Sequence, residues 1–169
     1  MRGLWFTYDS NGWVILAEQD LDADGFAEDI FSQTFDGYGQ LIDQLHDVDG
    51  DGIYDERYIL SYTSNGDRDV VQWDVDNDGT VDVTYTYLYD ATPLLITLET
   101  DLDSDGTPDQ RTEYIRDGSG NMVQETFDDG IDGTLEAVKD YTQPGLVGGD
   151  YYYDWDQTGD GAYNVRVEE

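Results

Sequence analysis

Cysteine is absent from the sequence, and histidine occurs once, as His46. The absence of cysteine excludes disulfides, thiolate zinc sites and cysteine nucleophiles. A zinc site is disfavoured further because zinc prefers histidine or cysteine ligands. No apolar run approaches the roughly 20 residues of a membrane helix, so we expect no membrane span. The N-terminus also lacks the pattern of a signal peptide.

Basic residues are scarce: 7 Lys and Arg stand against 40 Asp and Glu, for a formal net charge of −33. A chain with this charge repels other polyanions, which excludes nucleic acid as a partner and disfavours an anionic membrane surface. Aromatic residues make up 14% of the chain, more than is typical of a disordered acidic tail. The composition therefore predicts a folded protein whose natural partner is a cation.

An internal repeat organises the chain. Acidic clusters begin at Asp20, Asp47, Asp74, Asp101 and Asp128, each 27 residues after the one before, and a sixth begins 28 residues later at Asp156. This spacing predicts a single repeat domain over residues 1–169. Its predicted parts are a partial unit 1–19, full units 20–46, 47–73, 74–100, 101–127 and 128–155, and a partial unit 156–169.

Segments rich in Tyr, Val, Ile, Thr and Leu lie between the acidic clusters, with apolar residues at alternate positions. A period of two is typical of β-strands. Turn-like signatures such as residues 8–12, 35–39 and 62–66 separate the two strands of each unit. We therefore predict an all-β fold, an antiparallel meander of tandem β-hairpin repeats. A sheet with so many strands is expected to coil or partly close, as a solenoid or ribbon does.

The acidic loops follow the pattern Asp-x-Asp-x-Asp-Gly-x-x-Asp, which predicts calcium binding. Calcium takes six to eight oxygen ligands, and four carboxylates crowded into one loop repel each other unless a cation binds. We expect the residue after each glycine to add a backbone carbonyl. The predicted ligands are Asp20, Asp22, Asp24, Phe26 and Glu28; Asp47, Asp49, Asp51, Ile53 and Asp55; Asp74, Asp76, Asp78, Thr80 and Asp82; and Asp101, Asp103, Asp105, Thr107 and Asp109.

Two further loops are degenerate copies with fewer acids, so we expect weaker binding there and a total of four to six calcium ions. In the first of them Gly130 replaces the middle acid. The alternative interpretation, that the Asp-Gly pairs are only hairpin turns, does not explain the acids on both sides of each pair. The predicted ligands of these loops are Asp128, Asp132, Thr134 and Glu136, and Asp156, Thr158, Asp160, Ala162 and Asn164.

The loops resemble the calcium loops of bacterial thrombospondin type 3 repeats and of FG-GAP and VCBS repeats. The turns, such as Tyr8-Asp9-Ser10-Asn11-Gly12, are similar to the YD repeats of Rhs and insecticidal toxin-complex proteins. No single family matches from end to end. The resemblance implies calcium binding in an extracellular bacterial setting, and it implies no catalysis by these residues.

Our first functional hypothesis is a non-enzymatic, calcium-binding structural module of a secreted or cell-surface bacterial protein, as in a stalk, an adhesin or a filament subunit. Two alternatives remain: a carbohydrate- or protein-binding module that uses an aromatic sheet face, and a shell segment of a larger Rhs-like toxin. Edge strands offer a route to self-association. We assign no catalytic residue, and we expect His46 to be a surface or loop residue.

Overall fold

The computed structural model describes residues 3–92, 94–142, 152–156 and 165–168, with no side-chain description at 142, 152–156 and 165–168. These residues form strands, turns and loops, and no helix suited to crossing a membrane occurs among them. The strands are β1 (Gly3–Tyr8), β2 (Val14–Asp20), β3 (Asp29–Phe35), β4 (Leu41–Asp47), β5 (Glu56–Tyr62), β6 (Arg68–Asp74), β7 (Val83–Tyr89), β8 (Leu95–Asp101), β9 (Gln110–Arg116), β10 (Met122–Asp129), β11 (Ala137–Thr142), β12 (Tyr152–Asp156) and β13 (Val165–Glu168).

The strand order runs from β1 to β13 without a crossover, which confirms the predicted antiparallel meander. Each strand follows its neighbour after a short connection, and short connections favour antiparallel pairing of consecutive strands. The order is linear, as in an open sheet. The repeat in the sequence is therefore a repeat of hairpins, with one acidic loop joining each hairpin to the next.

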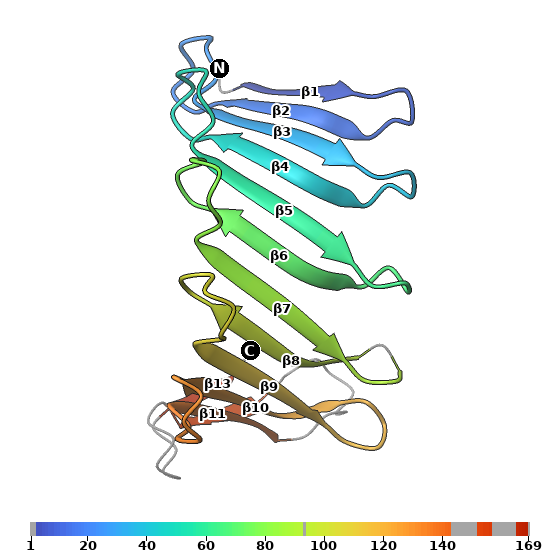
Figure 1. Ribbon diagram of the computed structural model, residues 1–169, viewed down its shortest axis with the longest axis vertical. Helices are drawn as coiled ribbons and strands as arrows, with labels where there is room; N and C mark the ends of the chain where they lie inside the picture. Colours follow the sequence, from blue (N-terminus) through green and yellow to red (C-terminus); the bar gives the residue numbers. More distant parts are fainter. Residues whose placement is uncertain (1–2, 93, 143–151, 157–164, 169) are drawn as a thin grey trace. The chain divides into compact units, whose positions relative to one another are not determined.

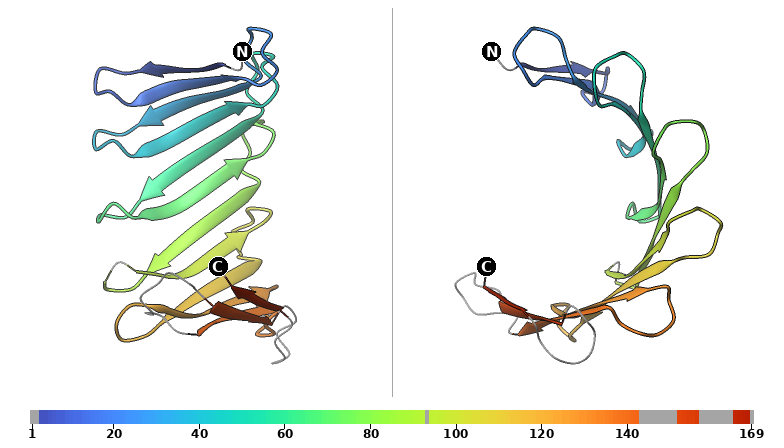
Figure 2. Two further views of the ribbon diagram at one scale, coloured as in Figure 1. Left: turned by 180° about the vertical axis from the view of Figure 1, so that it is seen from behind. Right: turned by 90° about the vertical axis from the view of Figure 1, so that its left-hand side faces the viewer.

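Two units divide the chain, Met1–Thr84 and Tyr85–Glu169. In the first unit, the acidic loops after β2, β4 and β6 lie along one edge of the sheet, and the turns after β1, β3 and β5 lie along the other (Figure 1). In the second unit, the loops after β8 and β10 share one edge, while the turns after β7 and β9 lie on the other. The view from behind in Figure 2 shows the same separation of loops and turns within each unit.

Cross-strand pairs of aromatic side chains stabilise the sheet of the first unit. Phe31 on β3 lies opposite His46 on β4, and their rings stack with centroids 4.0 Å apart. Tyr58 on β5 stacks on Trp73 of β6 with centroids 5.4 Å apart. Residues at alternate positions of the sequence thus meet as stacked ring pairs between neighbouring strands.

The sheet has little hydrophobic core. Among the described residues, Val71 is the only fully buried hydrophobic side chain, and most strand residues are partly buried. The most deeply buried side chains are instead Asp20 and Asp47, with 2% and 1% of their surface exposed. Both end a strand and begin an acidic loop, so burial in this protein is concentrated where the loops start.

Candidate metal centres

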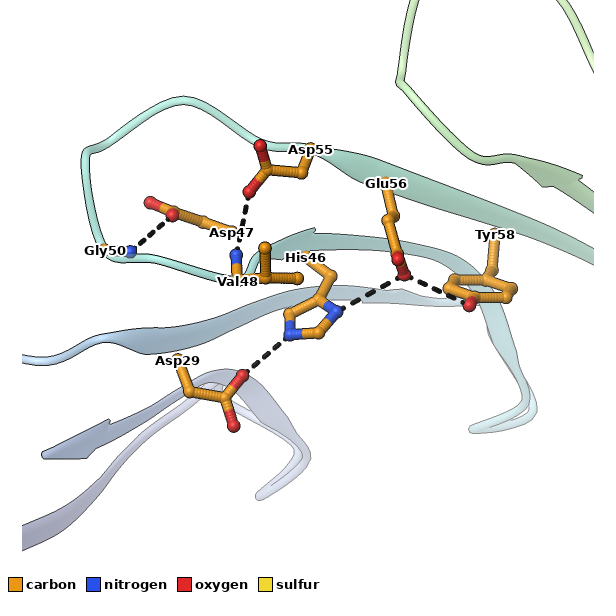
Figure 3. A network of polar contacts seen from close by, with 8 residues as sticks. All are labelled: Asp29, His46, Asp47, Val48, Gly50, Asp55, Glu56 and Tyr58. Atoms are coloured by element: carbon orange, nitrogen blue, oxygen red, sulfur yellow. Dashed lines mark hydrogen bonds and ion pairs between the residues drawn. The ribbon is translucent and has the colours of Figure 1, made fainter. Parts of the chain in front are cut away.

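The acidic loops are loop 1 (20–28), loop 2 (47–55), loop 3 (74–82), loop 4 (101–109) and loop 5 (128–136), with positions numbered one to nine. The aspartate at position one holds each loop in shape. In loop 2, Asp47 Oδ1 accepts a hydrogen bond from the Gly50 N–H at 2.7 Å, and Oδ2 accepts one from the Gly52 N–H at 2.9 Å (Figure 3 draws the first). The corresponding donor pairs are Ala23 and Gly25 to Asp20, Asp78 and Gly79 to Asp74, Asp105 and Gly106 to Asp101, and Asp132 and Gly133 to Asp128.

The acid at position nine closes each loop. Asp55 Oδ2 accepts a hydrogen bond from the Val48 N–H at 2.9 Å, and the Asp55 N–H donates to the His46 carbonyl at 2.8 Å (Figure 3 draws the first). These two bonds tie the end of the loop to its beginning and start the next strand. The same pair of bonds is made by Glu28, Asp82, Asp109 and Glu136.

In loops 1 to 4, positions three and five carry exposed acids that each use one oxygen locally. In loop 2, Asp49 Oδ1 accepts from the Asp51 N–H at 3.2 Å, and Asp51 Oδ1 accepts from the Ile53 N–H at 2.8 Å. Such side-chain bonds to the amide two residues ahead are Asx-turns, which fix the direction of the carboxylate. The second oxygen of each side chain makes no hydrogen bond within the described residues, so it is available to a cation.

Positions four and six of each loop adopt the left-handed backbone conformation, and in loop 5 Gly130 at position three does so as well. Position six is always glycine, as in Gly52 with φ 89°, which confirms the turn expected from the sequence. Position four also has a positive φ, and it is a glycine only in loop 2, where Gly50 has φ 71°. The conformation at position four was not predictable, because alanine, serine and isoleucine do not indicate a positive φ. The residues at position four of the other loops are Ala23, Asn77, Ser104 and Ile131.

Four of the loops bring carboxylate oxygens within 4.8 Å of one another, a spacing that fits a metal ion. Loop 1 brings together all four predicted acids, whereas Asp51, Asp82 and Asp105 stand outside the groups of the other three loops. The groups are Asp20, Asp22, Asp24 and Glu28; Asp47, Asp49 and Asp55; Asp74, Asp76 and Asp78; and Asp101, Asp103 and Asp109. Each is a set of hard oxygen donors, which suits a hard cation.

Loop 5 keeps the hydrogen-bonded frame but, among the described residues, forms no such carboxylate group. Gly130 stands where the other loops carry the middle acid. A hydrogen bond from the Thr134 N–H lowers the pKa of Asp132 below its ordinary value, so this carboxylate is ionised at neutral pH. The predicted residues Thr158, Asp160, Ala162 and Asn164 lie outside the described residues, as does the side chain of Asp156.

The expectation that His46 is a surface or loop residue is wrong. It lies on β4, and only 18% of its side-chain surface is exposed. Its Nε2 lies 2.7 Å from Asp29 Oδ1 on β3, and its Nδ1 lies 3.5 Å from Glu56 Oε2 on β5 (Figure 3). The sequence did not show this arrangement because the two carboxylates come from neighbouring strands, whose register decides the contact.

The turns at the opposite edge have a frame of their own. Asp117 Oδ1 accepts hydrogen bonds from the Ser119 and Asn121 amides at 2.8 and 3.0 Å. Hydrogen bonds from Asn121, both side chain and backbone, lower the pKa of Asp117. The pKa of Asp90 is lowered chiefly by the Thr92 hydroxyl, and that of Asp9 chiefly by the Trp13 amide.

No protein-family model matches the sequence, and neither does any curated protein. Several solved structures are similar to the chain at low identity. The TcdB2-TccC3-Cdc42 crystal structure is 17% identical with a TM-score of 0.41, covering 96% of this chain and 11% of that one. TcdB2-TccC3 is 15% identical with a TM-score of 0.45, covering 96% and 12%. The Tc holotoxin pore of Photorhabdus luminescens is 16% identical with a TM-score of 0.36, covering 96% and 11%. The chain thus spans about a tenth of the length of these proteins.

Proposed function

We propose that the chain is a calcium-binding structural module in which bound ions hold the acidic edge of the sheet in shape. The observation that carries this proposal is the set of four carboxylate groups, each with oxygens within 4.8 Å of one another. Each group is built by the same loop frame, whose buried position-one aspartate accepts two backbone hydrogen bonds. A frame of this kind directs further carboxylates into one small space.

Calcium fits the donor set better than the other common ions. The groups consist of carboxylates alone, whereas zinc would require histidine or cysteine. Magnesium keeps several of its waters and demands a stricter octahedral geometry. We expect the carbonyls of Phe26, Ile53, Thr80 and Thr107 to complete the coordination. Four Ca²⁺ ions would change the formal net charge from −33 to −25.

Ion binding is expected to couple to folding. A ligand that binds the folded loop and not the unfolded chain stabilises the folded state. The effect is large here because close carboxylates repel one another without a cation. A calcium-rich extracellular medium suits such a chain, and we propose a secreted or cell-surface setting and a non-catalytic role on that ground.

The test is calcium counting combined with thermal unfolding. We expect about four ions at saturation, one for each carboxylate group, and a large rise of Tm that EDTA reverses. Magnesium at the same concentration serves as the control and should give a much smaller rise. An unchanged melting curve after chelation, with no bound calcium, would refute the proposal.

A second candidate is a wall segment of a larger β-sheet protein of the Rhs type. It is favoured by the scarcity of core, since Val71 is the only fully buried hydrophobic side chain of the described residues. The turns in which an aspartate accepts backbone hydrogen bonds resemble YD repeats, and this resemblance also favours the second candidate. If the sheet faces normally pack against other protein, the isolated calcium-loaded chain should bind a hydrophobic dye strongly. Weak dye binding by a well-folded monomer would count against this candidate.

A further inference from the structure

Consecutive acidic loops of the first unit touch through the residue at position four. In the first unit, Gly50 of loop 2 lies against the end of loop 1. A Cβ atom added to Gly50 would stand 2.0 Å from the carbonyl oxygen of Ala27 and 2.9 Å from the Cα of Glu28. No side chain fits in this space, so the two backbones are in direct contact.

The next pair of loops repeats the contact with a side chain. Asn77, at position four of loop 3, donates from Nδ2 to the carbonyl of Tyr54 at 2.9 Å. Tyr54 directly precedes Asp55, the closing acid of loop 2. In the second unit the contact comes from position three instead: the N–H of Gly130 in loop 5 donates to the carbonyl of Asp109, the closing acid of loop 4, at 2.6 Å.

In every one of these pairs, the later loop rests on the backbone at position eight or nine of the earlier loop. Position nine is the closing acid, whose carboxylate belongs to the carboxylate group in loops 1, 2 and 4. An ion that fixes the closing acid also fixes the backbone on which the next loop rests. Ordering of one loop thereby lowers the entropic cost of ordering its neighbour.

We propose that ion binding to consecutive loops of the first unit is positively coupled through these position-four contacts. The proposal rests on the calcium binding proposed above. Electrostatics alone predicts the opposite sign, because a cation in one loop repels a cation in the next. That repulsion is weakened beyond the Debye length of about 8 Å at physiological salt, whereas direct contacts are not screened. The sign of the coupling therefore distinguishes the two mechanisms.

The test uses the position-six glycine amides as site-specific NMR reporters, because each donates to the buried aspartate of its own loop. Asp49→Asn removes an exposed ligand from loop 2. We expect it to raise the calcium midpoint at Gly79 of loop 3 about fivefold, within the usual range of coupling between sites. As a matched control, Asp103→Asn in loop 4 should leave the midpoint at Gly25 unchanged.

Substitutions at position four distinguish the effect of the contact between loops from the effect of the charge that Asp49→Asn removes. Asn77→Gly keeps a residue that tolerates the positive φ but removes the hydrogen bond to Tyr54. In the Asn77→Gly background, Asp49→Asn should raise the calcium midpoint at Gly79 by less than about twofold. One such hydrogen bond accounts for most of a fivefold change in affinity. The reverse variant, Gly50→Asn, should uncouple loop 1 from loop 2 by forcing them apart.

Three outcomes decide the matter. A reduced effect in Asn77→Gly, with all loops still binding, supports the coupling. An unchanged Gly79 midpoint in Asp49→Asn, or a shift that persists undiminished in Asn77→Gly, overturns it while the calcium proposal stands. The absence of any calcium-dependent shift at the glycine amides overturns the calcium proposal and the coupling with it.

Discussion

Loops 2 and 5 share one hydrogen-bonded frame and differ in the acids that the frame carries. Asp47 and Asp128 each accept two amide hydrogen bonds, and Asp55 and Glu136 each close their loop with the same two bonds. Only loop 2 forms a close carboxylate group, because Gly130 replaces the middle acid of loop 5. The acids at positions one and nine thus hold the loop in shape through hydrogen bonds. The residue at position three can vary, and it decides whether the loop has enough carboxylates to bind a cation.

The largest expected effect comes from breaking the frame itself. Asp47→Ala removes the buried carboxylate that accepts from the Gly50 and Gly52 amides, and each hydrogen bond to a charged acceptor contributes about 1.5–3 kcal/mol. We expect a loss of about 3–5 kcal/mol in the free energy of unfolding, measured by urea denaturation at saturating calcium. Asp128→Ala should cost a similar amount, because loop 5 uses the same frame.

The control for this prediction is Asp49→Asn, which changes an exposed ligand and leaves the frame intact. It should weaken ion binding with a much smaller loss of stability. Equal costs for Asp47→Ala and Asp49→Asn would show that the two acids do not have separate roles.

A smaller effect is expected from restoring the middle acid in loop 5. Gly130→Asp adds a carboxylate and should tighten calcium binding at this loop about tenfold, or about 1.4 kcal/mol. Gly130 has φ 87°, so the calcium-free protein should lose about 1 kcal/mol of stability. Calorimetric titration measures the first effect. Gly130→Asn places a side chain at the same positive φ without adding a charge. An equal gain in calcium affinity in that variant would show that the added carboxylate is not the cause.

Position four offers a smaller change that does not involve charge. Ile131 holds φ 49°, which is unfavourable for a β-branched residue. Ile131→Asn should stabilise the protein by about 1 kcal/mol and raise Tm by about 2–4 °C. The reversal, Asn77→Ile, also removes the hydrogen bond to Tyr54, so it should lower Tm by more than Ile131→Asn raises it. If both variants melt at the temperature of the parent chain, backbone strain at position four has no measurable cost.

The smallest effect concerns the turns at the opposite edge, where no cation is expected. Hydrogen bonds lower the pKa of Asp117 in the folded state below its ordinary value of 3.8. Their stabilisation is present above the unfolded-state pKa and is lost as the pH falls through the lowered folded-state pKa. A carboxyl-carbon NMR titration should therefore place the midpoint of Asp117 below 3.8. A midpoint at or above that value would contradict the described hydrogen bonds.

The meander and the loop positions were predictable because local spacing determines them. Apolar residues with a period of two give strands, and acids at alternate positions followed by glycine give loops. The position-six glycines, such as Gly52, were visible in the sequence because their conformation selects for glycine. These features depend on neighbours in the chain and need no knowledge of the register.

The different roles of identical residues were not predictable. Asp47 and Asp49 look alike in the sequence, yet Asp47 is buried at the end of β4 while Asp49 is exposed. Ala23, Ser104 and Ile131 give no sign of a positive φ. The contacts of His46 with Asp29 and Glu56 depend on the register of three strands, which residue spacing alone does not specify.

The near absence of fully buried hydrophobic side chains, with Val71 as the only one among the described residues, has a calorimetric consequence. The heat capacity of unfolding rises with the apolar surface that unfolding exposes, and an ordinary domain gives about 12–15 cal/mol/K per residue. A sheet with so few fully buried apolar side chains should give a smaller value. Its stability should then vary little over a broad range of temperature.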